Sequence, residues 1–207
     1  VGLFLRVARP DAGQRRAPAA LAADTSPAPA ASTALAAGGG SASSTLVAQP
    51  AQADPDVAAV SKALTLQGGQ QVLAVLRGRK LIENRAWKIP VGWYAIHSGS
   101  QLINDDRAER IRQAWPDAPA EESIPHGAIL GLFYVHSHRS PEACRPGYIW
   151  ARGPICHLVS KAVELPRPIR CRGGKGLWPL EAWQLQKIRE QLAEASVSRF
   201  DLAEATG

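Results

Sequence analysis

The sequence predicts an α+β fold in which a mixed β-barrel is flanked by short helices and preceded by a disordered segment. Three observations predict it. Several short segments are rich in β-branched and aromatic residues and are bounded by Gly or Pro. Two or three segments have helical periodicity, and the first 57 residues have a low-complexity composition. Four to six strands with two or three helices suit a compact barrel better than a layered βαβ sheet.

The N-terminal segment, residues 1–57, consists mainly of Ala, Pro, Ser, Thr and Gly. With few large apolar side chains to bury, it cannot offset an ordering cost of roughly 1–2 kcal/mol per residue, which predicts disorder. The first 20 residues contain four Arg, one Asp and an apolar start. This composition resembles an organelle transit peptide and predicts import, whereas a plain disordered extension is the alternative.

The strand predictions begin after this segment, with order expected from about residue 57. The four strongest strand segments are residues 80–87, 92–97, 127–136 and 155–165. Pro166 and Pro168 are expected to end the last strand, because proline lacks the N–H that a sheet ladder needs. Residues 169–171 are expected to extend it after a kink. Together, residues 60–180 form the predicted folded domain.

Three helices are predicted, over residues 70–77, 104–115 and 179–195. Gly78 follows the first at the position where a left-handed residue commonly ends a helix. Asn104 is placed to cap the second, and Pro179 to occupy the first position of the third. The third helix belongs to a C-terminal segment, residues 179–207, that we expect to pack on the domain and end in a tail.

The charge is distributed unevenly along the chain. Residues 61–180 carry 17 Lys/Arg against 9 Asp/Glu, whereas residues 1–60 are balanced and residues 181–207 are slightly acidic. The excess positive charge of the predicted domain indicates an anionic partner such as RNA, a nucleotide or a phosphate. A basic surface that serves only solubility is the alternative.

The cysteine and histidine residues do not predict a metal site. The three cysteines are an odd number without a Cys-x-x-Cys pair, which indicates free thiols and an intracellular setting in the cytoplasm or nucleus. The His and Cys residues between 136 and 157 lack the spacing of a zinc site, so we expect neither metal nor cofactor. No run of 18 apolar residues is present, so no membrane partner is expected.

Five segments in order carry a likeness to a known family. They are residues 78–87 (GRKLIENRAW), 95–99 (AIHSG), 125–131 (PHGAILG), 150–154 (WARGP) and 166–178 (PRPIRCRGGKGLW). Over about residues 63–180 the chain resembles the ASCH family (activating-signal-cointegrator homology), in particular its single-domain bacterial-type members. The resemblance implies a PUA-like barrel whose cleft is lined by the first motif, Gly78-x-Lys80-x-x-Glu83-x-Arg85. It also implies RNA or a nucleotide as ligand.

The first motif contains the main candidate site residues. On a regular strand Glu83 and Arg85 would share one face, and Lys80 would lie on the other. We therefore expect Glu83 and Arg85 to be the cleft pair, with the carboxylate orienting a guanidinium that keeps free donors for a ligand. An internal ion pair that supports the barrel is the alternative. Lys80 reaches the cleft only if the chain after Gly78 turns it back.

Five further residues are candidates for ligand or RNA binding. Trp87 and Trp178 lie beside motif cations and could stack on bases, although a core role is the alternative. His97 ends the second predicted strand and could orient a ligand. Arg172 and Lys175 belong to a basic glycine-rich loop that suits an anion, or that is only an exposed turn.

Three functions remain open from the sequence. The first is a non-catalytic, monomeric RNA- or nucleotide-binding module. The second is a small amidohydrolase for an acetylated nucleoside, implied by members of the family with catalytic Lys, Thr and Glu. Lys80 matches that Lys, but Glu83 replaces the Thr, and Glu164 is a candidate third residue only by strand order. The third is a coactivator-like domain that binds a protein partner. A buried Lys80 beside Glu83 would favour an enzyme. An open basic groove would favour RNA binding, and a filled cleft would favour a scaffold.

Overall fold

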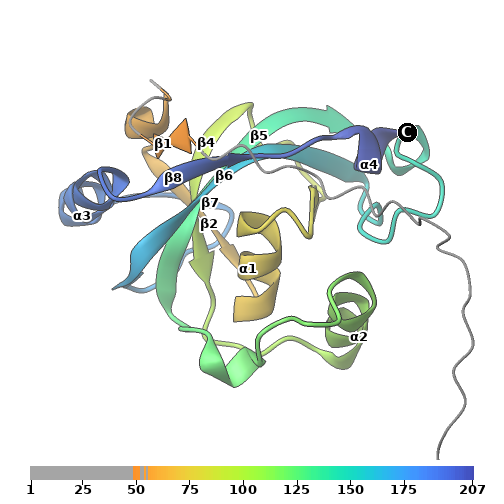
Figure 1. Cartoon of the computed structure of the whole chain (residues 1–207), viewed down its shortest axis with the longest axis horizontal. Helices are drawn as coiled ribbons and strands as arrows, with labels where there is room; N and C mark the ends of the chain where they lie inside the picture. The colour runs from red at the N-terminus through yellow and green to blue at the C-terminus, as the bar shows by residue number, and fades with distance from the viewer. Residues whose placement is uncertain (1–48, 52–53, 55) are drawn as a thin grey trace, which may run out of the picture. The chain divides into compact units, whose positions relative to one another are not determined.

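The computed structural model describes residues 49–51, 54 and 56–207. This part of the chain is an α+β unit with one curled, half-barrel sheet and four short α-helices, which confirms the predicted class (Figure 1). The described sheet has eight strands, more than the four to six predicted, and it is an open path rather than a closed barrel. None of the helices in the described ranges has the length and apolar character needed to cross a bilayer.

The start of the fold lies earlier than predicted. The expected disorder and transit peptide over residues 1–48 lie outside the described residues. Strand β1 (Gln49–Pro50), however, pairs with β8 (Ser196–Arg199). The Asp54 side chain is only 4% exposed and accepts a hydrogen bond of 2.7 Å from Lys161 Nζ. These contacts with β8 and with strand β6 (Ile155–Arg170) tie residues 49–50 and 54 to the unit, which local composition could not indicate.

The sheet is mainly antiparallel. The remaining strands are β2 (Lys62–Leu66), β3 (Ile82–Arg85), β4 (Gly92–Ser98), β5 (Ala128–Arg139), β6 (Ile155–Arg170) and β7 (Leu177–Pro179). Their order along the sheet is β1-β8-β6-β5-β4-β2-β7, and only β2 and β4 pair in parallel among the described strands. Off this path, β3 pairs with the first part of β6, residues 155–158, whereas β8 pairs with β6 over residues 161–163. Two strands distant in sequence thus share one edge of β6.

Strand β6 does not end at its prolines, contrary to the prediction. Gly131 pairs with Glu164 and Ile129 with Ile169, so four residues of β6 lie opposite a single residue of β5. Pro166 and Pro168 fall in this irregular stretch, where no ladder N–H is required. The strand therefore continues through them to Arg170.

The residues predicted to begin or end the helices do so with one exception. Helix α1 (Gly69–Leu76) is followed by Gly78 with φ of +68°, and α2 (Asp105–Ala114) has its first turn capped by the Asn104 side chain. Helix α3 (Ala182–Leu192) begins three residues after Pro179, which instead ends β7. A capping box between Glu181 and Gln184 sets this later start. A short helix, α4 (Ala203–Thr206), was not predicted.

The two faces of the sheet pack against different helices. Leu64 and Ile96 point to the face covered by α1, whereas their neighbours Ala63 and Ala95 point to the face that also buries Ile188 of α3. This alternation is the expected two-residue period of a strand. Figure 1 shows α1 within the curve of the sheet and α3 outside it. The ends of β2 and β4 near α1 are not covered by α3.

The close contact between α1 and β5 gives a testable prediction. A Cβ atom added at Gly131 would lie 2.3 Å from the Val163 carbonyl oxygen and 2.5 Å from a Leu76 methyl. Because backbone cannot move easily, we expect Gly131→Ala to lower the free energy of unfolding by about 3 kcal/mol in urea denaturation.

The matched control for this prediction is Gly147→Ala. Gly147 has φ of +76°, but an added Cβ would meet no atom within 4 Å. This variant should be destabilised only by the cost of the left-handed backbone, about 1–2 kcal/mol. Equal destabilisation of the two variants would show that the close approach to β6 and α1 is not the cause.

Candidate functional site

A cleft of about 1160 Å³ opens beside α1 and the C-terminal ends of β2 and β4. Its walls come from β2, β3, β4, α1 and α2, together with two loops at residues 149–152 and 171–176. The first loop lies between β5 and β6, and the second joins β6 to β7. Segments far apart in the sequence therefore build the cleft.

The charged groups of the cleft are nearly all cationic. Seven Lys or Arg residues line it: Lys80, Arg85, Arg107, Arg110, Arg152, Arg172 and Lys175. Glu83 is the single acidic residue among the described lining residues. Such an excess of one sign in a concave site produces a positive potential that attracts anions.

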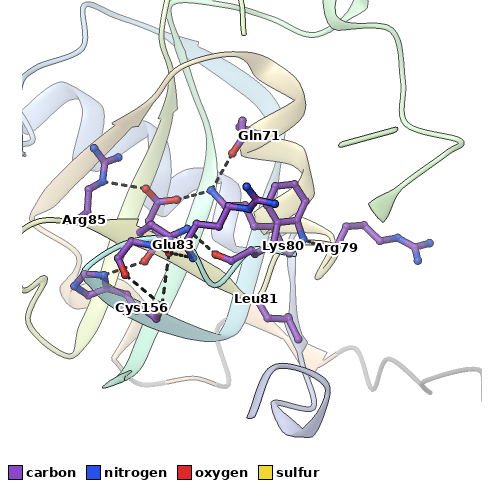
Figure 2. A network of polar contacts seen from close by, with 12 residues as sticks. Gln71, Arg79, Lys80, Leu81, Glu83, Arg85 and Cys156 are labelled. Carbon is purple, nitrogen blue, oxygen red and sulfur yellow. Dashed lines mark hydrogen bonds and ion pairs between the residues drawn. The ribbon is translucent and has the colours of Figure 1, made fainter. Parts of the chain in front are cut away.

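The charged residues of the first motif, Lys80, Glu83 and Arg85, come together at the floor of this cleft. The Glu83 carboxylate lies 2.6 Å from Lys80 Nζ and 2.9 Å from Arg85 Nε (Figure 2). The chain after Gly78 turns Lys80 back into the cleft, the outcome that the sequence left open. Strand β3 begins only at Ile82, so Lys80 lies in the turn after Gly78, where strand alternation does not apply. Glu83 and Arg85 form the internal ion pair that was the alternative, and both residues also line the cleft.

Helix α1 fixes the position of Lys80. Two N–H groups, of Arg79 and Lys80, donate to the Ala74 carbonyl at 2.8 and 2.9 Å and turn the chain back under the helix. The Lys80 ammonium then donates to Gln71 Oε1 at 2.9 Å and lies 5.7 Å from the ring centroid of Trp150. Lys80 is 5% exposed, and the carboxylate, amide and ring replace the water it has lost.

The environment of Glu83 determines its ionisation. Burial raises the pKa of this carboxyl, but the positive charges of Lys80 and Arg85 outweigh burial and hold the pKa below its usual value. Next to it, His157 Nε2 accepts from the Ile89 N–H at 2.9 Å, so Nδ1 carries the proton and donates to the Glu83 carbonyl at 2.9 Å. Burial lowers the pKa of His157, and this neutral ring anchors β3 to β6.

The glycine-rich loop after β6 rests on His97. The Cys171 carbonyl accepts from His97 Nε2 at 3.1 Å, and burial lowers the pKa of this imidazole. A Cβ at Gly173 would lie 2.7 Å from the His97 ring and from Thr65 Oγ1, so only glycine allows this approach. Trp178 packs edge-on against His97 and donates to Thr65 Oγ1 at 3.1 Å. This packing presents Arg172 and Lys175 to the cleft.

Six of the eight predicted ligand-binding residues line the cleft: Lys80, Glu83, Arg85, His97, Arg172 and Lys175. The two predicted stacking platforms do not. Trp178 lies behind the glycine-rich loop, bonded to Thr65. Trp87 follows the end of β3 and is 37% exposed outside the cleft lining. It lies two residues after β3, in an irregular segment where strand alternation does not apply.

Several lining residues were missed from the sequence: Gln71, Asn84, Arg107, Arg110, Trp150 and Arg152. Asn84 donates to the Trp150 carbonyl at 2.7 Å and accepts from the Gly153 N–H at 2.8 Å, which holds the loop at residues 149–152 against β3. The only sequence signal for this contact was that residues 78–87 and 150–154 both belong to the segments that resemble the ASCH family. For the two α2 arginines, Arg107 and Arg110, no sequence signal pointed to the cleft.

Glu164, proposed as a third catalytic residue by strand order, lies elsewhere. It forms a bidentate ion pair with Arg77, at 2.8 and 2.9 Å, and does not line the cleft. Within the described ranges, no cluster of three or more His, Cys, Asp or Glu is arranged to hold a metal ion. The three cysteines are free thiols.

Comparisons with known proteins returned no family model and no curated protein that matches this chain.

The buried charges at the cleft floor give a second prediction. Replacing Glu83 with Gln leaves Lys80 and Arg85 without their counterion, so we expect the free energy of unfolding to fall by about 3–5 kcal/mol at neutral pH. Because the pKa of Glu83 is lowered on folding, its stabilisation is complete above the unfolded-state value of about 4.5 and is lost as pH falls through the folded-state pKa. Urea denaturation between about pH 3 and 7 measures both effects.

Glu164→Gln is the matched control, because its ion pair with Arg77 is roughly 40% exposed on both sides. It should change stability little at any pH. An acid dependence of unfolding in Glu83→Gln that equals the parent's would contradict the assignment of this ionisation to Glu83.

Proposed function

We propose that this chain is an ASCH-like, PUA-like module that binds RNA or a nucleotide in its basic cleft. The observation that carries the proposal is the charge balance of the cleft, seven cations against one carboxylate that two of those cations already engage. The surplus positive charge needs an anionic partner, and phosphate groups supply one. The ordered resemblance of residues 63–180 to the ASCH family supports the same ligand class.

Several cationic groups are available to a ligand. Among the described residues, Arg110, Arg172 and Lys175 have no ion-pair partner. Arg85 is oriented by Glu83 and by one bond of 3.2 Å to the Thr65 carbonyl. A guanidinium has five N–H donors, so Arg85 retains donors for a phosphate or a base edge. These groups come from β3, α2 and the glycine-rich loop, and they surround the cleft.

The glycine-rich loop adds main-chain donors. Gly173, Gly174 and Gly176 have no side chains of their own to keep an anion away from the main chain, and Gly176 has φ of +60°. Successive N–H groups in such turns form concave anion sites. With Arg172 and Lys175 in the same loop, this wall is the best-suited part of the cleft for a phosphate.

A third prediction tests this function. We expect a salt-dependent affinity for single-stranded RNA in fluorescence anisotropy titrations. In Arg172→Ala/Lys175→Ala, the slope of log affinity against log salt should fall by roughly 0.7 for each phosphate that the variant can no longer neutralise. Both side chains are accessible to solvent, so the variant should fold as the parent does.

The charge-matched control is Lys187→Ala/Arg189→Ala. These cations lie on α3, outside the cleft. This control should bind RNA as the parent does. Absence of any salt-dependent binding by the parent, or equal weakening of binding in the two double variants, would refute a site at the cleft.

One observation favours a second function, an amidohydrolase acting on a modified nucleoside. Lys80 and Glu83 are buried side by side, 2.6 Å apart, at the cleft floor. The cleft is also open and basic, as RNA binding requires. The protein-interaction function would require a filled cleft, and this cleft is not filled. In its ion pair with Glu83, Lys80 is an ammonium, which has no lone pair for nucleophilic attack.

A fourth prediction separates the two functions. We expect no hydrolysis when the protein is incubated with N4-acetylcytidine and the products are separated by chromatography. Turnover by the parent that Lys80→Ala abolishes, with Glu164→Gln retaining it, would instead support the hydrolase. Thermal unfolding of Lys80→Ala must accompany the assay, because removal of the ammonium leaves Glu83 with Arg85 alone.

A further inference from the structure

A second, smaller pocket adjoins the cleft. It has a volume of about 370 Å³, and Ile149 and Trp150 line both cavities. The segment at residues 148–152 therefore forms a shared wall. Two contacts with residues 81–84 fix its position: Tyr148 Oη accepts from the Leu81 N–H at 3.3 Å, and Asn84 donates to the Trp150 carbonyl at 2.7 Å.

Two consecutive residues of the first motif line different cavities. Lys80 lines the cleft, whereas Arg79 lines the second pocket. Figure 2 shows the Arg79 side chain extending away from the Lys80–Glu83 pair. Trp150 Nε1 donates to the Arg79 carbonyl at 2.8 Å, so the main chain between the two cations is attached to the shared wall. The positive charge thus continues from the cleft to the far side of the wall.

The second pocket has two cations available for a ligand. Arg79 and Arg145 are exposed, and neither has an ion-pair partner within the described part of the chain. Glu204 is the acidic residue in the lining. Burial raises the pKa of Tyr148 to about 12, so its hydroxyl stays neutral beside them.

We propose that the second pocket extends the cleft into one path for single-stranded RNA, which crosses residues 148–152 and places phosphates against Arg79 and Arg145. This inference rests on the proposed function of the cleft. Two exposed arginines would hold a free phosphate only weakly. A phosphate on a strand already held in the cleft has a high effective concentration at the second pocket.

The geometry favours a single strand over a duplex. The path bends around a wall between two concave cavities, and a flexible strand can follow such a bend. A duplex is stiff over many base pairs and would contact only the rims. Single-strand sites span roughly 4–16 nucleotides, and a strand near the upper end of this range is long enough to occupy both cavities.

A fifth prediction follows from the two lengths of ligand. Mixed-sequence RNA strands of roughly 4 and roughly 12 nucleotides are titrated by fluorescence anisotropy against the parent and Arg79→Ala/Arg145→Ala. We expect the double variant to bind the long strand roughly tenfold more weakly near physiological salt, with a salt slope smaller by roughly 1.4. The short strand, which the cleft alone accommodates, should bind both proteins equally.

The control is again Lys187→Ala/Arg189→Ala, which removes the same charge from α3 and should bind both strands as the parent does. Equal binding of the long strand by the parent and Arg79→Ala/Arg145→Ala would overturn the path while leaving the cleft as a site. Failure of the parent to bind either strand would overturn the proposed function itself. A duplex of the same length that binds as tightly, and whose binding the double variant weakens equally, would overturn the single-stranded assignment.

Discussion

The cleft depends on the carboxylate of Glu83, which lies between Lys80 and Arg85 at its floor. A buried lysine is costly unless an opposite charge and hydrogen bonds replace its hydration. Glu83 supplies that charge, and Gln71 of α1 supplies a further acceptor. Through Arg85 the same carboxylate is connected to the Thr65 carbonyl of β2. One ion-pair network therefore holds together α1, β2 and β3, the three elements that form the cleft floor.

The remaining cations of the cleft repel one another, and the protein separates them by placing them on different elements. Arg107 and Arg110 come from α2, Arg152 from the loop before β6, and Arg172 and Lys175 from the loop after it. An anion bound among them would relieve this repulsion and stabilise the folded state by mass action. The stability of the fold and the binding of an anion in the cleft are thus thermodynamically linked.

Local sequence signals predicted those features that local interactions decide. The Asn104 cap and the turn at Gly78 are formed within one or two helical turns, and both were predicted. The position of Lys80 was left open by the sequence, because it depends on where β3 begins, which pairing with β6 decides. Trp150 reaches the cleft only through its contacts with β3 and the turn before it, about 70 residues earlier. Strands β7 and β8 are short, and long-range pairing alone defines them.

The shared edge of β6 affects how the chain reaches its native state. Strand β3 occupies residues 155–158 of that edge and β8 occupies residues 161–163, while β8 in turn holds β1 near the start of the described chain. Pairing of partners this distant in sequence costs a large loop-closure entropy before any contact energy is gained. The motif strand can therefore dock only after β6 has been synthesised, and the edge is complete only when β8 has left the ribosome. During synthesis, the unpaired edge of β6 can associate with other chains.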